Sequence, residues 1–144
     1  MSRPGHITHV QFADLPVDHQ DRAIAFYTQL GPRVARDAPY QEGWRWVELE
    51  IPGARTRIRL SRRPATGAAS AGEGQRRGGG ERGGSGADEP ALALEVDDVD
   101  AFHAAASAHG ATFAQAPAEA PWSPGRRYAL LRDSEGNTVL VQSG

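Results

Sequence analysis

The sequence contains no cysteine and no lysine, and each absence removes a class of chemistry. Without cysteine, the chain has no disulfide framework, no thiolate nucleophile and no cysteine-ligated metal. Without lysine, it cannot form a Schiff base through a side-chain amine. All 16 basic residues are therefore arginine, a bias typical of GC-rich bacterial genomes.

Long apolar runs and a strong net charge are also missing. No stretch approaches the roughly 18 apolar residues of a membrane span, and no segment resembles a signal peptide. The formal net charge of -2 gives no electrostatic reason to expect nucleic acid or an anionic membrane as a partner. We therefore expect a cytoplasmic protein that binds neither.

The apolar content is low because of one segment. Residues 62–90 contain no aromatic residue and no Leu, Ile or Val, so this segment cannot bury enough surface to order itself. Its composition of Gly, Ala, Ser, Arg and Glu predicts a flexible linker. At this length we expect a single domain over residues 1–144, with modules at 6–61 and 91–142 on either side of the linker.

The remainder of the chain repeats itself. Val17 and Gly31 have the same spacing as Val96 and Gly110, and each pair follows an apolar, strand-like run. Apolar residues between the members of each pair recur at helical spacing, and glycine is the usual residue after a helix end. Strand-like segments follow each glycine. The pattern predicts two copies of a β-α-β-β-β unit, with a ligand site between them.

Local signals place the elements. In the first copy we expect strands at 6–12, 33–37, 44–51 and 55–61, and a helix capped by Asp18. In the second copy we expect strands at 91–96, 112–115, 126–132 and 138–142, and a helix from Asp98 to His109. Pro16 cannot donate to a sheet ladder, which suggests a sheet edge or a bulge.

Two motifs resemble those of a known family. Arg22 to Tyr27 (RAIAFY), followed by Leu30 and Gly31, resembles the first helix of the vicinal oxygen chelate superfamily. The turn from Asp133 to Asn137 (DSEGN) resembles its second signature. Members include glyoxalase I, bleomycin-resistance proteins, fosfomycin-resistance enzymes and extradiol dioxygenases. The resemblance implies an α+β fold in which two βαβββ modules form a curved eight-stranded half-barrel, often completed in a homodimer.

The resemblance also locates the metal ligands of the family's enzymes, which are usually His, Gln or Glu. In this chain the four positions carry Phe12, Arg59, Ala91 and Leu140. None of these side chains can ligate a metal, and an arginine repels a cation. The histidines offer no obvious replacement, because His6 and His9, for example, point to opposite faces of a strand. We expect no metal and no other cofactor.

Strand alternation predicts which residues face the cleft. An apolar floor with aromatic walls and a few polar groups is typical of a small-molecule site. Arg57 and Arg59 either bind an anionic group of the ligand or form a ladder with neighbouring Glu residues. The tryptophans either contact ligand or pack a dimer. The candidate ligand-binding residues are Phe12, Trp44, Trp46, Arg57, Arg59, Glu95, Trp122, Tyr128, Leu140 and Gln142.

Three functions are compatible with these features. The first is a metal-free, bleomycin-resistance-like protein that sequesters an apolar or aromatic small molecule. The second is a glyoxalase- or dioxygenase-type enzyme with an atypical metal site, or with Glu48, Glu50 or Glu95 as a base. The third is a structural or regulatory dimer without a ligand. The lost ligand set and the Trp-bearing strands favour the first.

Overall fold

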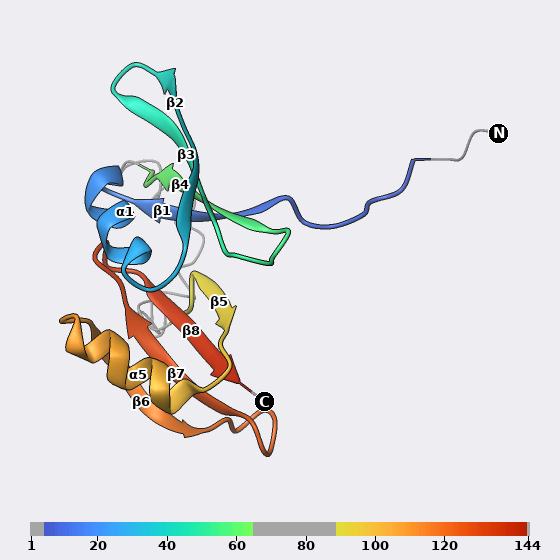
Figure 1. The fold of residues 1–144 in the computed structure, drawn as a ribbon, viewed down its shortest axis with the longest axis vertical. Helices are drawn as coiled ribbons and strands as arrows, with labels where there is room; N and C mark the ends of the chain where they lie inside the picture. Colours follow the sequence, from blue (N-terminus) through green and yellow to red (C-terminus); the bar gives the residue numbers. More distant parts are fainter. Residues whose placement is uncertain (1–4, 65–88, 144) are drawn as a thin grey trace, which may run out of the picture.

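The computed structural model describes residues 5–64 and 89–143. Most of the predicted linker at 62–90 lies outside the described residues, although Arg62 ends a strand. No helix in the described part of the chain is long and apolar enough to cross a membrane. The described residues form two four-stranded sheets, each with one helix (Figure 1).

The first module has the predicted β-α-β-β-β order. Its elements are β1 (Phe12–Val17), α1 (Gln20–Thr28), β2 (Arg33–Gln41), β3 (Trp44–Glu50) and β4 (Arg57–Arg62). The strands lie in the order β1-β4-β3-β2, with β1 parallel to β4 and the other pairs antiparallel. Gly31, with a φ of 125°, follows the end of α1 as predicted.

The second module repeats this arrangement. Its elements are β5 (Leu92–Glu95), α5 (Val99–Ala108), β6 (Thr112–Glu119), β7 (Arg127–Arg132) and β8 (Thr138–Ser143). The strand order β5-β8-β7-β6 matches that of the first sheet, and β5 is parallel to β8. The α+β fold of two βαβββ modules is confirmed.

The predicted first strand at 6–12 is wrong in position. Residues 5–11 have no secondary structure and are exposed, whereas β1 begins at Phe12. Leu15 and Val17 are fully buried in β1, and this burial determines where the strand pairs. Pro16 is tolerated because β1 is an edge strand with β4 as its one neighbour, and the prediction of a sheet edge at Pro16 is confirmed.

One face of each sheet packs on a helix. In the first sheet this face carries the buried apolar residues of three strands, and in the second it carries Ala129, Leu131, Val139 and Val141. Phe26, Leu92 and Leu94 pack against both clusters, so the two cores are continuous across the module boundary. The buried set of the first sheet is Leu15, Val17, Val47, Leu49, Ile58 and Leu60.

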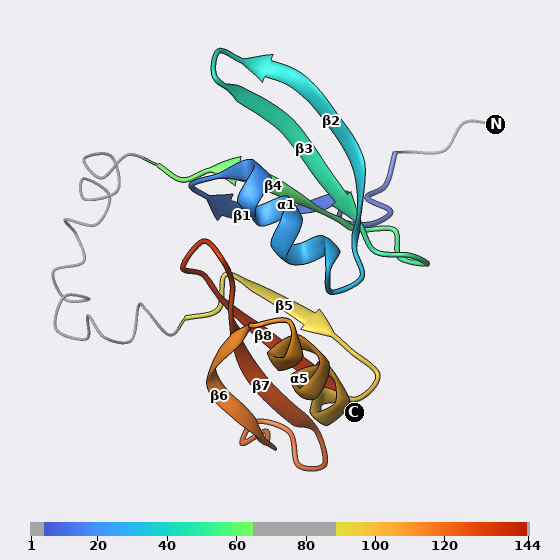
Figure 2. The same ribbon diagram turned by 60° about the vertical axis from the view of Figure 1, so that its left-hand side comes forward.

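The turn between β7 and β8 joins the modules at the start of α1, as Figure 2 shows. Glu135 Oε1 accepts hydrogen bonds from the backbone N–H groups of Asp18 and His19, each at 2.9 Å. Asp18 was predicted to cap α1, but His19 is the N-cap and has no side-chain cap bond. The carboxylate that binds these N–H groups comes instead from the other module, and it also pairs with Arg22.

Candidate ligand-binding face of the first sheet

The face of the first sheet opposite α1 carries aromatic and charged side chains. Because side chains alternate along a strand, burying Leu15, Leu49 and Ile58 against the helix turns their neighbours to the open face. Phe12 lies in register with Arg57 across β1 and β4, and Glu48 lies opposite Arg59 across β3 and β4. The predicted site residues of this module therefore lie on two adjoining strand pairs.

Arg59 lies at the centre of an aromatic group. Its guanidinium carbon lies 4.4 Å from the ring centroid of Trp46 and 5.5 Å from that of Phe12. Tyr40 and Phe12 both meet Trp46 edge-on, with centroid distances of 5.1 and 5.8 Å. Arg59 Nε donates to Asp14 Oδ1 at 2.6 Å, which fixes the guanidinium over the rings. This is a preformed cation–π arrangement with one aromatic edge, Tyr40, more than half exposed.

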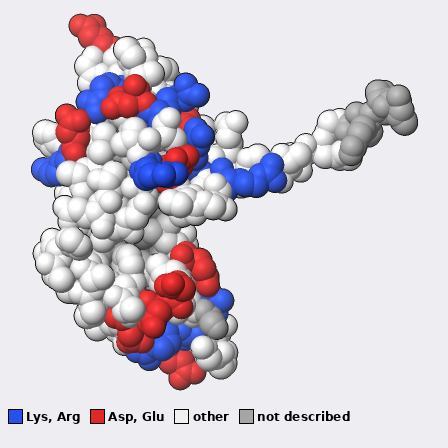
Figure 3. Space-filling view, viewed as in Figure 1, with Lys and Arg blue, Asp and Glu red and all other residues white. Residues whose placement is uncertain are grey.

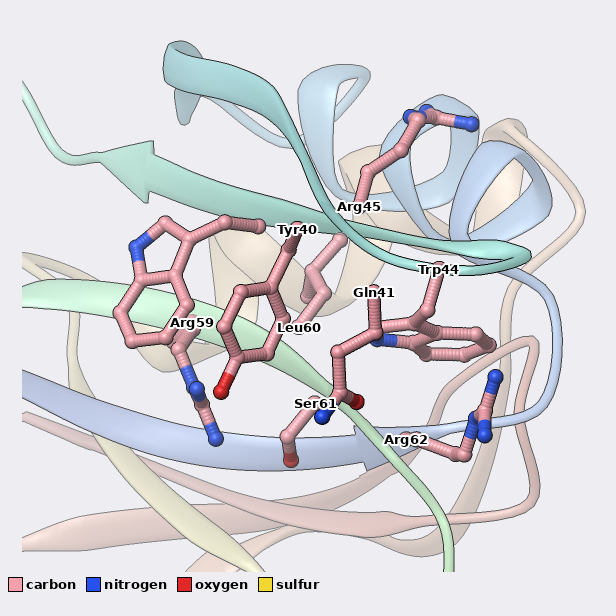
Figure 4. A pocket seen from close by; sticks show the side chains of 9 residues that line it. Tyr40, Gln41, Trp44, Arg45, Arg59, Leu60, Ser61 and Arg62 are labelled. Carbon is pink, nitrogen blue, oxygen red and sulfur yellow. The ribbon is translucent and has the colours of Figure 1, made fainter.

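A cavity of about 200 Å³ adjoins this group (Figure 4). The side chains of Tyr40, Trp44 and Arg62 surround it in the close-up, and the guanidinium carbon of Arg62 lies 4.9 Å from the Trp44 ring. Arg45 contributes to the lining, but its side chain leads away toward the helix, where it pairs with Asp21 and Asp37. The remaining lining residues are Gln41, Trp46, Arg59, Leu60 and Ser61.

Glu48 separates this cavity from a second one. Its two carboxylate oxygens accept hydrogen bonds from Trp46 Nε1 at 2.7 Å and from Arg57 Nη1 at 2.8 Å. Burial raises the pKa of Glu48, but these bonds and the charges of Arg57 and Arg36 outweigh it, so the pKa lies below its usual value. Glu48 is therefore a fixed anion rather than a base poised near neutral pH.

The second cavity has a volume of about 410 Å³ and an arginine-rich lining. Arg36 comes from β2, Arg55 from the β3–β4 turn and Arg57 from β4. The other lining residues are His9, Gln11 and Glu48. Sequence reasoning missed Tyr40 because it ended the second strand at 37, and it missed Arg36 and Arg55 because it did not assign either residue to the cleft-facing set. The dipeptide Glu42-Gly43 before Trp44 was the available signal for a hairpin and a longer β2.

The predicted residues of the second module form a separate group on the second sheet. Trp122 stacks at a tilt on Tyr128, with centroids 4.9 Å apart, and its indole N–H donates to Gln142 at 3.3 Å. Glu95 is paired with Arg126 at 2.7 Å. Leu140 lies beside these residues, in register with Ala93 and Leu130. Trp122 remains about half exposed.

The structure thus divides the predicted residues into two groups. In the described residues 5–64 and 89–143, no hydrogen bond, ion pair or ring contact joins one group to the other. Arg57 pairs with Glu48 across β3 and β4, as in the ladder alternative, whereas Arg59 pairs with Asp14 of β1. A third cavity of about 410 Å³ does lie between the modules, but on the helix side, where Tyr27, Ile51, Leu94 and Phe102 are among its lining residues.

The residues at the family's metal positions do not fit a metal. Phe12 and Arg59 lie against each other on the first sheet, and the guanidinium is held by Asp14. Ala91, just before β5, and Leu140 of β8 offer only hydrocarbon side chains. Elsewhere in the described part of the chain, no group of three or more His, Asp or Glu residues is arranged to hold an ion. Glu50 and Glu95, the other candidate bases, are each paired with an arginine.

Charged side chains gather at the two ends of the molecule in the view of Figure 3, and a band across the middle is largely uncharged. Acidic and basic groups alternate at the upper end, over the first sheet. The mixture at the upper end reflects the ion pairs of the first sheet, whereas acidic groups gather over the second module in that view.

Comparisons with known proteins identify the family. A model of the Glyoxalase/Bleomycin resistance protein/Dioxygenase superfamily matches residues 3–141. The fold is similar to that of UcmS2, with 23% identity, a TM-score of 0.71, and 95% of this chain and 98% of that chain covered. It is also similar to TnmS3, an antibiotic binding protein from Streptomyces sp. CB03234, with 25% identity, a TM-score of 0.70, and 97% and 98% covered. TioX from Micromonospora sp. ML1 has 23% identity, a TM-score of 0.58, and 95% and 96% covered. No curated protein sequence matches the chain at a significant level. The chain belongs to the Glyoxalase/Bleomycin resistance protein/Dioxygenase superfamily.

Proposed function

We propose that the protein is a metal-free binding protein that sequesters an aromatic small molecule without converting it. The observation that carries this proposal is the group formed by Arg59, Trp46, Phe12 and Tyr40 on the open face of the first sheet. Flat aromatic ligands bind to such walls by stacking and by burial of apolar surface.

The group is preorganised for binding. Asp14 holds Arg59, and Glu48 accepts from the Trp46 indole, so neither side chain needs to be ordered when a ligand arrives. Fixing side chains before binding reduces the entropy lost on association. The residues at the family's metal positions also support a metal-free site, because Phe12 offers only hydrocarbon there and Arg59 offers a cation.

The relatives support binding over catalysis. TnmS3, similar to this chain over nearly its whole length, is an antibiotic binding protein. We extend that activity to this chain as the proposal of a bleomycin-resistance-like role. The group of Trp122, Tyr128, Leu140 and Gln142 is a separate aromatic surface on the second sheet and is not part of the proposed site.

A ligand screen tests this function. Purified protein is titrated with planar polycyclic aromatics while intrinsic tryptophan fluorescence is recorded, and hits are repeated by calorimetry. We expect saturable quenching with at least one compound. The variant Trp46→Ala should weaken binding by at least tenfold, about 1.4 kcal/mol. The matched control is Trp122→Ala, which leaves the first sheet intact. If no aromatic compound binds, the proposal fails.

We further propose that the protein is a homodimer. Residues 5–11 run away from the body of the molecule (Figure 1), and Ile7 is 95% and Val10 62% exposed. An exposed segment that carries large apolar side chains beside an edge strand is a usual site for pairing with another chain. A second copy of this chain is the occupant that the proposal assigns to it.

A further inference from the structure

The arginine-lined cavity on the open face indicates what else the ligand carries. This inference rests on the proposed function, because it concerns a second part of the same site. It is based on an excess of arginines over carboxylates in this cavity. Three arginines, Arg36, Arg55 and Arg57, line the cavity of about 410 Å³, and Glu48 is the one carboxylate among its lining residues.

Glu48 does not neutralise all three. Its oxygens are taken by Arg57 and by the Trp46 indole. Arg36 lies opposite Glu48 across β2 and β3 but forms no hydrogen bond with it. In the described part of the chain, Arg36 and Arg55 have no ion pair, whereas Arg33, Arg45, Arg59 and Arg63 each have a carboxylate partner. Arg36 is therefore near enough for its charge to act on Glu48 without pairing to it, and Arg55 has no carboxylate partner among the described residues.

The arginine-lined cavity adjoins the aromatic group, and Glu48 lies between the two. Glu48 lines the arginine cavity and lies opposite Arg59, which lines the cavity beside Trp46. The Trp46 indole N–H donates to Glu48, so aromatic wall and arginine cluster are joined by one hydrogen bond. Gln11 adds an amide to the arginine side. A ligand seated on Trp46 can extend along β3 and β4 to the arginines.

We propose that this cavity is an anion subsite and that the ligand is an aromatic acid, with its carboxylate or phosphate bound by Arg36 and Arg55. Guanidinium groups bind both kinds of oxyanion through paired N–H donors, and such charge-assisted bonds are about twice as strong as neutral ones. Arg57 stays with Glu48 and forms the boundary of the subsite. A neutral aromatic ligand leaves both arginines without a partner.

The test compares three probes with the same ring system: naphthalene carboxylate, naphthyl phosphate and naphthalene carboxamide. Calorimetry on the full chain should give at least tenfold tighter binding for one or both anions than for the amide. The preferred anion identifies the group. The preference should shrink when salt is added, because exposed charge pairs are screened. Equal affinity of all three probes would overturn the subsite while leaving aromatic binding intact.

The variants locate the effect. Arg36→Gln combined with Arg55→Gln should reduce the anion preference to about threefold or less and leave binding of the amide unchanged. Arg33→Gln is the matched control, because Arg33 is an exposed arginine of the same strand that already pairs with Glu50. A preference that survives in the double variant, or that disappears in the control, contradicts the assignment.

A measurement without an aromatic ligand separates this inference from the proposed function. Inorganic phosphate is titrated into the full chain while the Nε–H signals of the arginines are followed by NMR. The signals of Arg36 and Arg55 should shift saturably, and that of Arg33 should not. If they shift but no naphthalene compound binds, the subsite stands and the proposed function fails. If they do not shift, the subsite is wrong.

Discussion

At the scale of single residues, Glu135 makes more of the described polar contacts between the modules than any other side chain. Its side chain is fully buried and receives hydrogen bonds from two backbone N–H groups, from Arg22 and from Ser134. Burial alone would raise its pKa, but these donors lower the pKa to about 2. A depressed pKa in the folded state means that the carboxylate stabilises the fold when it is ionised.

This residue gives a pH prediction. The stabilisation is complete above the unfolded-state pKa near 4.5 and is lost as pH falls toward 2. We expect Glu135→Gln to lower the free energy of unfolding at neutral pH by about 2 kcal/mol, since it removes the charge but keeps the shape. Urea unfolding across this pH range checks it. The gap between variant and wild type should narrow as the pH is lowered through this window.

The control is Glu42→Gln, at an exposed carboxylate of the β2–β3 turn. It should leave the free energy of unfolding unchanged at each pH. A gap between Glu135→Gln and wild type that stays constant down to the acid limit would contradict the assignment of the carboxylate.

Arg59 shows how far sequence reasoning reaches for one residue. Alternation along β4 correctly placed Arg59 on the face of the sheet away from the buried Ile58 and Leu60. Whether it would bind a ligand or a neighbouring carboxylate depended on the pairing of β1 with β4, which brings Asp14 opposite Arg59. That register joins segments distant in sequence, so no local pattern could supply it. The same limit applies to Arg36, because only the pairing of β2 with β3 brings it beside Glu48.

At the scale of elements, the contact of α1 with the β7–β8 turn holds the two modules together. The Tyr27 hydroxyl, fully buried on α1, donates to Asp133 Oδ2 at 2.6 Å. Asp133 also accepts from the backbone N–H groups of Glu135 and Asn137, which shapes the turn. Asn137 Nδ2 donates to the Pro16 carbonyl on β1. One turn thus bonds to both the helix and the edge strand of the other module.

Removing the hydroxyl tests this contact. We expect Tyr27→Phe to lower the free energy of unfolding by about 1–2 kcal/mol, because a buried carboxylate oxygen loses its strongest donor. Tyr40→Phe is the matched control, since the Tyr40 hydroxyl is exposed and has no hydrogen bond in the described structure. Thermal or urea unfolding compares the two. Equal stability of both variants would show that the contact contributes nothing.

The first strand shows where element prediction failed. The segment His6 to Phe12 contains several β-prone residues, so local reasoning favoured a strand there. The structure instead pairs β1 from Phe12 with β4, because Leu15 and Val17 belong to the core. Pro16 indicated a sheet edge or a bulge, and β1 is an edge strand. Tertiary burial therefore outweighed local propensity.

At the scale of the whole molecule, the duplicated unit was predictable and the arrangement of the copies was not. Equal spacing from Val17 to Gly31 and from Val96 to Gly110 was sufficient to predict two βαβββ modules. The two helices differ where the modules meet. Arg22 of α1 pairs with Glu135 of the other module, whereas Ala101 of α5 lines an apolar cavity. Such asymmetry arises from individual side chains at the junction, which the repeat does not reveal.

The exposed segment at residues 5–11 leads to a prediction about dimer formation. We expect the wild-type chain to be dimeric, and removal of residues 1–8 to weaken the dimer by at least tenfold, because Ile7 is then lost from the interface. Light scattering with size exclusion, over about two decades of concentration, measures this. Ile7→Ser, which keeps the segment, should weaken the dimer in the same direction. A wild-type monomer throughout the range would contradict the proposal.

The central claim is that an aromatic ligand binds on the open face of the first sheet, against Trp46. The most direct measurement follows the indole N–H signals of the three tryptophans by NMR while naphthalene carboxylate is added. Each signal is assigned with a variant in which that tryptophan is replaced by phenylalanine. The account predicts a saturable shift of the Trp46 signal, because its N–H donates to Glu48 at the edge of the site. A ligand that binds and leaves the Trp46 signal unmoved would contradict it.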